Sequence, residues 1–383
     1  MMNLMTRIGM ATFGIILAVG FCGCASCPRE TACAPAAANA NPLKVAVFAD
    51  KGPSGVGAVE WYRLVNDSPD MTLKIVDGEQ VRNGALEGQD LLIMPGGSSK
   101  KEYESLGTNG VEKMKAFIRA GGAYFGTCAG CCLLMDGKNR AHVIPWNTRG
   151  AESDLLFPNV KVNAAGAKAL GIKEGDHRFR YHGGPFMWPT TNVIDGAKFE
   201  LWATVNSEAT YCGEINKKKQ MFGAAAIVGG TYGKGRVFVT SMHPEYFEST
   251  HYLVRAGIRY LTGRDVALRR PPRQRGDLAV GCFAICGSVK SVEASLELAA
   301  VDGIDLQVMN ANDILWSDRL AHLDVLIVPG GVSEKNAQLR AEVEAFIARG
   351  GVFISCRAKN APKGAVICKD TQGVIQKVRE LAH

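Results

Sequence analysis

The stretch AYFGTCAGCCLL, residues 123–134, decides the fold of this chain. Its apolar first half predicts a buried strand, and the helical-looking run after it begins at a tight turn built around Gly126-x-Cys128-x-Gly130. The two glycines remove Cβ atoms that would clash in such a nucleophile elbow, so the Cys128 thiol is expected above the sheet at a helix N-terminus. The helix dipole and backbone N–H groups favour a thiolate there, which makes Cys128 a candidate nucleophile.

A second apolar strand, residues 235–241, follows a glycine-rich turn and runs into His243-Pro244-Glu245. A histidine that reaches a cysteine can serve as its base, and a carboxylate can orient that histidine. Cys128, His243 and Glu245 are therefore the candidate catalytic residues.

Together, the elbow and the His243-Pro244-Glu245 ending resemble the class I glutamine amidotransferase-like superfamily. The finer pattern resembles its biotin-protein ligase N-terminal-type branch, because Pro95-Gly96-Gly97 and Tyr181-His182-Gly183-Gly184-Pro185 accompany the Cys128-Ala129-Gly130 elbow. The resemblance covers roughly residues 43–265. It implies that Cys128 is the nucleophile, His243 the base and Glu245 its partner.

The helix after the elbow departs from the family pattern. Glutamine-hydrolysing members usually carry a His or Asn and then a Gln there, which help to hold the substrate glutamine, whereas this chain has Cys131 and Cys132. The resemblance therefore implies a small-molecule or peptide amide as substrate, and not free glutamine.

Two further segments are expected beside the nucleophile. The loop with Gly96 and Gly97 follows a predicted strand, so its N–H groups and that of Ala129 are suited to stabilise an oxyanion at the carboxyl end of the sheet. A plain strand-ending turn is the alternative for this loop. The resemblance places His182, Gly183 and Gly184 at the pocket, with His182 either a substrate contact or a structural residue.

Strands are predicted at residues 43–49, 71–76 and 90–94, with helix-sized spacers between them. This alternation predicts an open parallel α/β sheet with right-handed crossovers, in a flavodoxin-like, class I glutamine amidotransferase-like domain. From residue 141 to about 205 the pattern weakens into short segments, which the resemblance places over the open end of the sheet.

Residues 1–24 are predicted to be a lipoprotein-type signal segment. Arg7 gives a positive start, the apolar run 8–21 is too short for a comfortable membrane span, and Gly23-Cys24 resembles the end of a lipobox. Cys24 is thus the expected lipidation site and residues 25–42 a flexible tether, which predicts a lipid-anchored protein of the cell envelope. A soluble secreted or periplasmic protein and a retained anchor are the alternatives.

A second, truncated α/β copy is predicted at residues 278–383, after an Arg- and Pro-rich linker at 266–277. Residues 323–331 and 345–354 repeat the pattern of the first unit. In a gapless alignment Arg357 takes the position of Cys128, and no histidine-carboxylate ending follows. The copy is therefore expected to be a degenerate packing or binding module.

The amino-acid composition of the chain argues against some classes of function. A chain of 383 residues with 47% apolar residues suffices for two domains, and its net charge of +7 comes without the interleaved aromatics of a nucleic-acid surface. No cofactor is expected, and no metal site either, because a second cysteine pair at ligand spacing is missing. Some of the twelve cysteines can pair in an oxidising compartment, but spacing does not decide which.

Three functions stay open at this point. The first is an amidase or acyl-transfer enzyme that uses the Cys-His-Glu triad, and the second is a non-catalytic ligand- or protein-binding module on the same fold. The third is a thiol redox protein that uses Cys128-x-x-Cys131. The sequence does not decide the oligomeric state.

Overall fold

A computed structural model describes residues 41–151, 155–206, 221–268, 274, 276–315 and 318–383. These residues belong to one compact unit, residues 38–383. The predicted signal segment 1–24, with Cys24, and nearly all of the predicted tether 25–42 lie outside them. Within the described ranges, no helix has the length and apolar character needed to cross a membrane.

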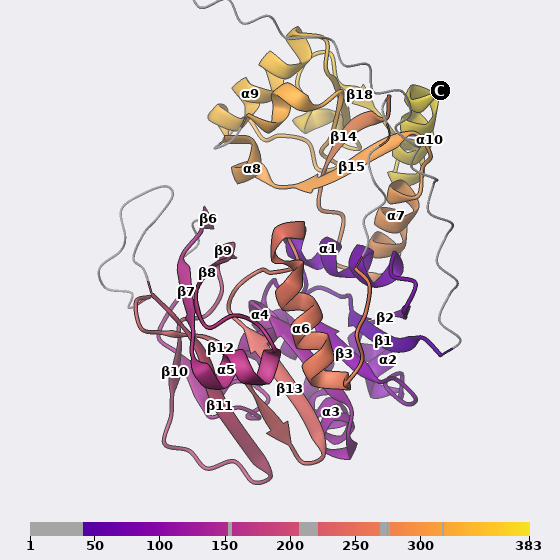
Figure 1. The fold of residues 1–383 in the computed structure, drawn as a ribbon. Coiled ribbons are helices and arrows are strands. Elements are labelled where there is room, and N and C mark those ends of the chain that lie inside the picture. The colour runs from indigo at the N-terminus through magenta and orange to yellow at the C-terminus, as the bar shows by residue number, and fades with distance from the viewer. Residues whose placement is uncertain (1–40, 152–154, 207–220, 269–273, 275, 316–317) are drawn as a thin grey trace, which may run out of the picture. The chain divides into compact units, whose positions relative to one another are not determined.

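The centre of the fold is an 11-stranded sheet whose main path has the order β2-β1-β3-β4-β13-β12-β11-β7-β8 (Figure 1). Its first five strands are mutually parallel. They are β2 (Met71–Val76), β1 (Leu43–Phe48), β3 (Leu91–Met94), β4 (Ala123–Thr127) and β13 (Gly235–Thr240). The predicted α/β fold class, with strands where the sequence placed them, is confirmed.

The other half of this sheet is antiparallel. The glycine-rich turn before residue 235 predicted the hairpin that leads into β13, whereas the sequence did not predict the strands beyond that hairpin. It comprises β12 (Ala225–Tyr232), β11 (Ala197–Val205), β7 (Asn159–Val162) and β8 (Gly175–Arg178), with β10 (Met187–Pro189) and β5 (Trp146–Thr148) off the main path. Residues 146–205 therefore extend the sheet, as well as covering it. Most of these strands are short and partly exposed, so the apolar alternation that marks a strand is weak in them.

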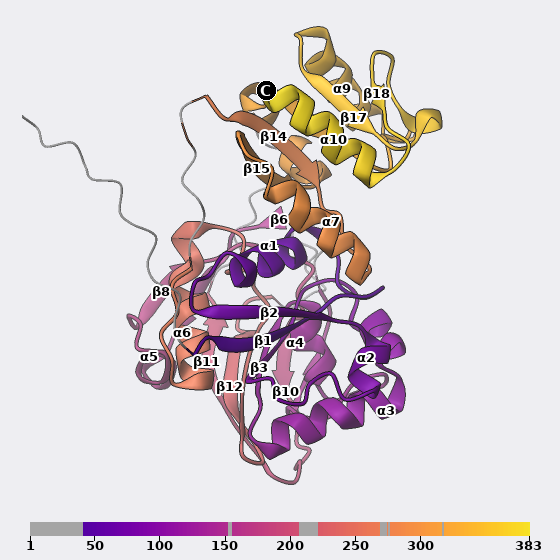
Figure 2. The same ribbon diagram turned by 90° about the vertical axis from the view of Figure 1, so that its right-hand side faces the viewer.

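Helices cover both faces of the parallel half (Figures 1 and 2). One face carries α1 (Gly55–Asn66) and α6 (His251–Thr262), and the other carries α3 (Ser99–Ala120) and α4 (Ala129–Leu134). In β1, Val45 and Val47 pack with α1, whereas Ala46 and Phe48 pack on the opposite side with α3. Such an apolar run is typical of a parallel strand that is buried on both faces. Two shorter helices are α2 (Gly78–Arg82) and α5 (Ala164–Leu170), and β6 (Leu155–Leu156) pairs with β9 (Tyr181–His182).

Residues 278–383, here called the C-terminal module, form a second sheet of five parallel strands in the order β15-β14-β16-β17-β18. The strands are β14 (Leu278–Phe283), β15 (Ile304–Met309), β16 (Val325–Ile327), β17 (Val352–Ser355) and β18 (Val366–Ile367), and the helices are α7 (Val289–Ala299), α8 (Ala311–Leu315), α9 (Ala337–Ala348) and α10 (Thr371–Ala382). The strand order repeats β2-β1-β3-β4, with β18 in the place of β13. The predicted second α/β unit is thereby confirmed.

Candidate active site

Cys128 sits at the junction of β4 and α4, at the carboxyl end of the parallel strands. Its φ of 50° and ψ of −106° are an unfavourable backbone conformation for a residue with a side chain, and such strain clusters at functional sites. A Cβ on Gly130 would lie 2.1 Å from the Met94 carbonyl oxygen, and one on Gly126 would lie 2.8 Å from Gly130. The glycines are therefore required sterically, as the elbow pattern predicted.

The end of β13 brings the histidine and the carboxylate to the same place. His243 Nδ1 lies 2.8 Å from Glu245 Oε1, and both side chains are buried. The His243 N–H donates to the Arg180 carbonyl at 2.8 Å, and the Cys128 N–H donates to the Thr240 carbonyl at the end of β13 at 2.9 Å. The backbone thus fixes Cys128 and the His243–Glu245 pair to one another through the sheet.

Burial, neighbouring charges and hydrogen bonds together shift the pKa of His243. Nδ1 faces a carboxylate oxygen, and Nε2 lies 3.3 Å from the His182 carbonyl oxygen, which can only accept. Burial by itself lowers the pKa of His243, but the negative charges of Glu245 and Cys128 outweigh it and raise the pKa to about 10. His243 is therefore an imidazolium at neutral pH, beside the sulfur of Cys128.

The predicted pocket residue His182 contributes its backbone to the centre of this site. Its carbonyl oxygen lies 3.7 Å from Cys128 Sγ, as well as facing His243 Nε2. Gly183 follows with a φ of 75°, and a Cβ on Gly184 would lie 2.0 Å from the Ser241 carbonyl oxygen. The segment therefore packs closely over the nucleophile, which is only 5% exposed.

The predicted oxyanion loop lies against the side chains of Cys128 and His243. A Cβ on Gly96 would lie 2.8 Å from His243 Cε1 and 3.1 Å from Cys128 Cβ. Gly97 has a φ of 150°, in a backbone that pairs with Pro53 in the loop after β1. Ala129 is the first residue of α4, so its N–H has no acceptor within the helix. The positions agree with the predicted roles of Gly96, Gly97 and Ala129, which stay predictions.

The two cysteines after the elbow are buried in the structure. Cys131 Sγ lies 3.2 Å from Met187 Sδ, and burial raises the pKa of this thiol well above its usual value. Burial also raises the pKa of Cys132 to about 11, against the opposing effects of Arg140 and a hydrogen bond to Ser99. Burial therefore disfavours the thiolate form of both residues, which is the form that would react with Cys128 or with a reagent in solution.

Glu102, on the first turn of α3, is a site residue that the sequence did not suggest. Its side chain is fully buried, and neither carboxylate oxygen has a hydrogen-bond partner. Burial and then the charge of Cys128 raise the pKa of Glu102 well above 4.5, while Arg140 lowers it. Burial of this kind favours the protonated, uncharged form of the carboxyl. An acidic residue in the first turn of a helix normally indicates a solvated carboxylate, which is why no sequence signal marked Glu102.

Tyr246, the residue that follows Glu245, is held by the C-terminal module. The guanidinium carbon of Arg180 lies 3.9 Å from the ring centre of Tyr246, and its Nη2 lies 3.9 Å from Oδ1 of Asp313, which belongs to α8. The Tyr246 hydroxyl bonds to Asp313 and lies 3.4 Å from Arg319 Nη1. The side chains of Arg180 and Asp313 are both buried. The module therefore supports the loop that carries His243 and Glu245, a contact that the sequence could not reveal.

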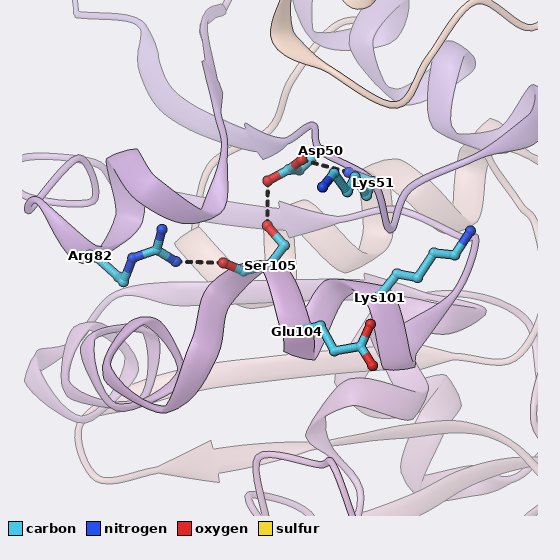
Figure 3. Close-up of a pocket in the computed structure, with 6 residues that line it drawn as sticks. All are labelled: Asp50, Lys51, Arg82, Lys101, Glu104 and Ser105. Atoms are coloured by element: carbon cyan, nitrogen blue, oxygen red, sulfur yellow. Dashed lines mark hydrogen bonds between the residues drawn. The ribbon is translucent and has the colours of Figure 1, made fainter.

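A surface pocket lies at the carboxyl end of β1, and no triad residue lines it. Its lining residues are Asp50, Lys51, Arg82, Lys101, Glu104 and Ser105 (Figure 3). Figure 3 shows Asp50 and Arg82 converging on Ser105, where Asp50 accepts from the hydroxyl and Arg82 donates to the carbonyl. These contacts fix α3 close to Gly107, where its backbone is not helical. We therefore assign the pocket residues a structural role. Elsewhere in the described residues, no cluster of His, Cys, Asp or Glu is arranged to hold a metal ion.

Comparison with known proteins bears on the first domain. Residues 60–133, from within α1 to within α4, match the family model described as "Biotin-protein ligase, N terminal". The resemblance predicted from the elbow is confirmed. A search of curated proteins gave no significant match.

Several solved structures are similar in fold. A protein from Thermoplasma acidophilum, described as part of a GMP synthase, has 16% identity and a TM-score of 0.40, covering 58% of this chain and 95% of its own. PurLQS from Thermotoga maritima has 13% identity and a TM-score of 0.42, covering 57% and 99%. A ThuA-like protein from Bacteroides uniformis has 13% identity and a TM-score of 0.45, covering 60% and 96%. At such identities, activity has to be argued from the residues of this chain.

Proposed function

We propose that this protein is a cysteine-dependent amidase or acyl-transfer enzyme, in which Cys128, His243 and Glu245 act as a triad. The observation that carries the proposal is the placement of His243. Its Nδ1 faces the Glu245 carboxylate, and its Nε2 and the Cys128 sulfur both face the carbonyl oxygen of His182. A cationic imidazole beside a cysteine at a helix N-terminus favours the thiolate. The substrate class is a small-molecule or peptide amide other than free glutamine.

The first half of the reaction follows from these charges. The Cys128 thiolate attacks the carbonyl carbon, and the electron pair of the C=O bond moves to oxygen, where the N–H groups of Gly97 and Ala129 stabilise it. When the C–N bond breaks, His243 Nε2 donates its proton to the leaving amine. For this step the substrate must replace the His182 carbonyl as the partner of Nε2.

The second half restores the enzyme. The now neutral His243 takes a proton from water or from another acceptor nucleophile, whose oxygen or nitrogen attacks the thioester carbon. The C–S bond breaks and Cys128 leaves as a thiolate, next to the re-formed imidazolium. Throughout the cycle Glu245 holds the Nδ1 proton and so fixes the orientation of the ring.

A non-catalytic binding module is the second candidate. The observation that favours it is the cover over the triad, since Cys128 is 5% and His243 6% exposed. The redox alternative has no comparable support, because Cys131 is fully buried against Met187.

The test compares the alkylation rates of individual thiols in the full chain. Chloroacetamide at pH 6 to 7, followed by peptide mapping, should modify Cys128 at least about tenfold faster than the other cysteines. His243→Ala should remove most of this advantage, because the raised pKa keeps the imidazolium present up to about pH 10. Cys131→Ser should leave the rate unchanged.

A panel of activated amides, with intact mass as readout, then separates turnover from binding. A transient acyl adduct on Cys128 supports the enzyme. Fast alkylation with no acyl adduct supports the binding module, and equal slow alkylation of every accessible thiol in all three proteins contradicts the triad.

We further propose that the protein is anchored in the cell envelope through a lipid on Cys24, on the strength of the Gly23-Cys24 ending of the apolar segment. In cells fed a clickable fatty acid, the wild type should be labelled and Cys24→Ala should not. Equal labelling of the two proteins would remove the support for lipidation at this cysteine.

A further inference from the structure

The C-terminal module carries a pair of cysteines that the proposed function does not use. β17 and β18 pair in parallel, with Ile354 opposite Val366 and Ser355 opposite Ile367. The next residues on the two strands are Cys356 and Cys368. The Cys368 N–H donates to the Ser355 carbonyl at 2.9 Å, which completes the Ser355–Ile367 pair and holds Cys368 beside the end of β17. Cys356 and Cys368 are therefore neighbours just past the last pair of this ladder.

Both thiols point to the same side of the sheet. Side chains alternate along a strand, so Cys356 shares a face with Ile354, and Cys368 shares a face with Val366. All four belong to one hydrophobic cluster, with residues of α10. Neighbouring strands are about 4.8 Å apart, which falls within the Cα separation of about 4.4–6.8 Å that a disulfide spans. Burial and then the charge of Cys368 raise the pKa of Cys356, in keeping with this proximity.

Cys282 is the other cysteine of this cluster, and the topology sets it further away. It lies on β14, opposite Ile327 of β16, and Ile327 lies opposite Ile354 of β17. Two strand spacings, about 9.6 Å, therefore separate the chain at Cys282 from β17. Cys282 is also deeply buried, whereas Cys356 is partly exposed and open to a reagent. The strand order therefore puts Cys368 one strand from Cys356 and Cys282 two strands from it, which favours pairing of Cys356 with Cys368.

We propose that Cys356 and Cys368 form a disulfide when the protein meets a disulfide oxidant such as glutathione disulfide. The Cys356 thiolate attacks one sulfur of the oxidant, whose S–S bond breaks and releases one glutathione thiolate. The Cys368 thiolate then attacks Cys356 Sγ and releases the second glutathione. The two cysteines lose two electrons and two protons, and one glutathione disulfide becomes two glutathione thiols.

The bridge closes the loop 357–367, which stands where the elbow helix stands in the first domain, and ties the edge strand β18 to β17. β18 has only two residues in the ladder, so little else holds this edge. A disulfide restricts the unfolded chain and should raise the stability of the module. The inference does not depend on the activity of Cys128.

Peptide mapping tests the pairing directly. The reduced full chain is equilibrated with glutathione disulfide, free thiols are alkylated in acid, and trypsin releases Gly350–Arg357 and Gly364–Lys369, each with a single cysteine. We expect these peptides linked, at a mass two hydrogens below their sum. The oxidised wild type should melt about 5 °C higher than the reduced protein.

Three variants make the result decisive. Cys356→Ser and Cys368→Ser should each abolish the linked peptides and the rise in melting temperature, whereas Cys282→Ser should keep both. Cys356 recovered as a stable glutathione adduct, as a bridge to Cys282, or alkylated despite excess oxidant would overturn the proposal.

Discussion

Replacing Gly57 by alanine should lower the alkylation rate of Cys128 at pH 6 by about tenfold, because it should break the contact between His243 and Glu245. Gly57 lies on α1, where an added Cβ would be 2.4 Å from Glu245 Oε1 and 2.8 Å from His243 Nδ1. Contacts this short force the dyad to move. Without the imidazolium beside it, the sulfur loses the positive charge that favours the thiolate, which is the form that is alkylated.

The cause of this loss can be separated from unfolding. Gly57 has ordinary helical geometry, and alanine favours a helix by about 1 kcal/mol over glycine, so circular dichroism should show an intact fold. Gly373→Ala in α10 is the matched control, since its nearest contact is an ordinary 3.4 Å and it lies in the C-terminal module. If Gly57→Ala reacted as fast as Gly373→Ala, His243 and Glu245 would not be what activates Cys128.

Local steric rules explain why the elbow could be predicted. Gly126 and Gly130 are separated from Cys128 by one residue each, so five consecutive residues are enough to predict the tight turn and the cysteine at its centre. The role of Gly57 could not be predicted in this way. It gives space to side chains from a distant part of the chain, and a single glycine carries no sign of what it faces.

The contribution of backbone groups to the site could not be predicted either. The sequence directed attention to the imidazole of His182, but the structure brings its carbonyl oxygen to Cys128 and His243. Any residue could supply that oxygen, so the residue type gave no information. Glu102 was missed for the opposite reason, because its type suggested solvent and only the packing shows that it is buried.

In the C-terminal module the same steric rules predict that the elbow is absent. In the gapless alignment Ser355 and Lys359 replace the two elbow glycines, so side chains stand where the first domain has none. The structure accordingly has a short 3-10 helix, Ala358–Asn360, in place of the elbow helix. The loss of the elbow was predictable from these residues. The contact of the module with Tyr246 was not, because it joins segments far apart in the sequence.

That contact gives the second large expected effect. Asp313→Ala should destabilise the protein by about 3–5 kcal/mol, because it leaves the buried Arg180 guanidinium without its acid. Urea unfolding measures this loss. The same variant should slow the alkylation of Cys128, since Arg180 also holds the His243 N–H through its carbonyl and stacks on Tyr246.

Two further variants decide whether the charge is the cause. Asp318→Ala, in the same module but with an 85% exposed side chain, should change the stability by less than about 0.5 kcal/mol. Adding Arg180→Met to Asp313→Ala removes the uncompensated charge and should recover much of the lost stability, because an apolar side chain of similar length can fill the buried site. If Asp313→Ala matched Asp318→Ala in both stability and thiol reactivity, the module would have no part in holding the catalytic loop.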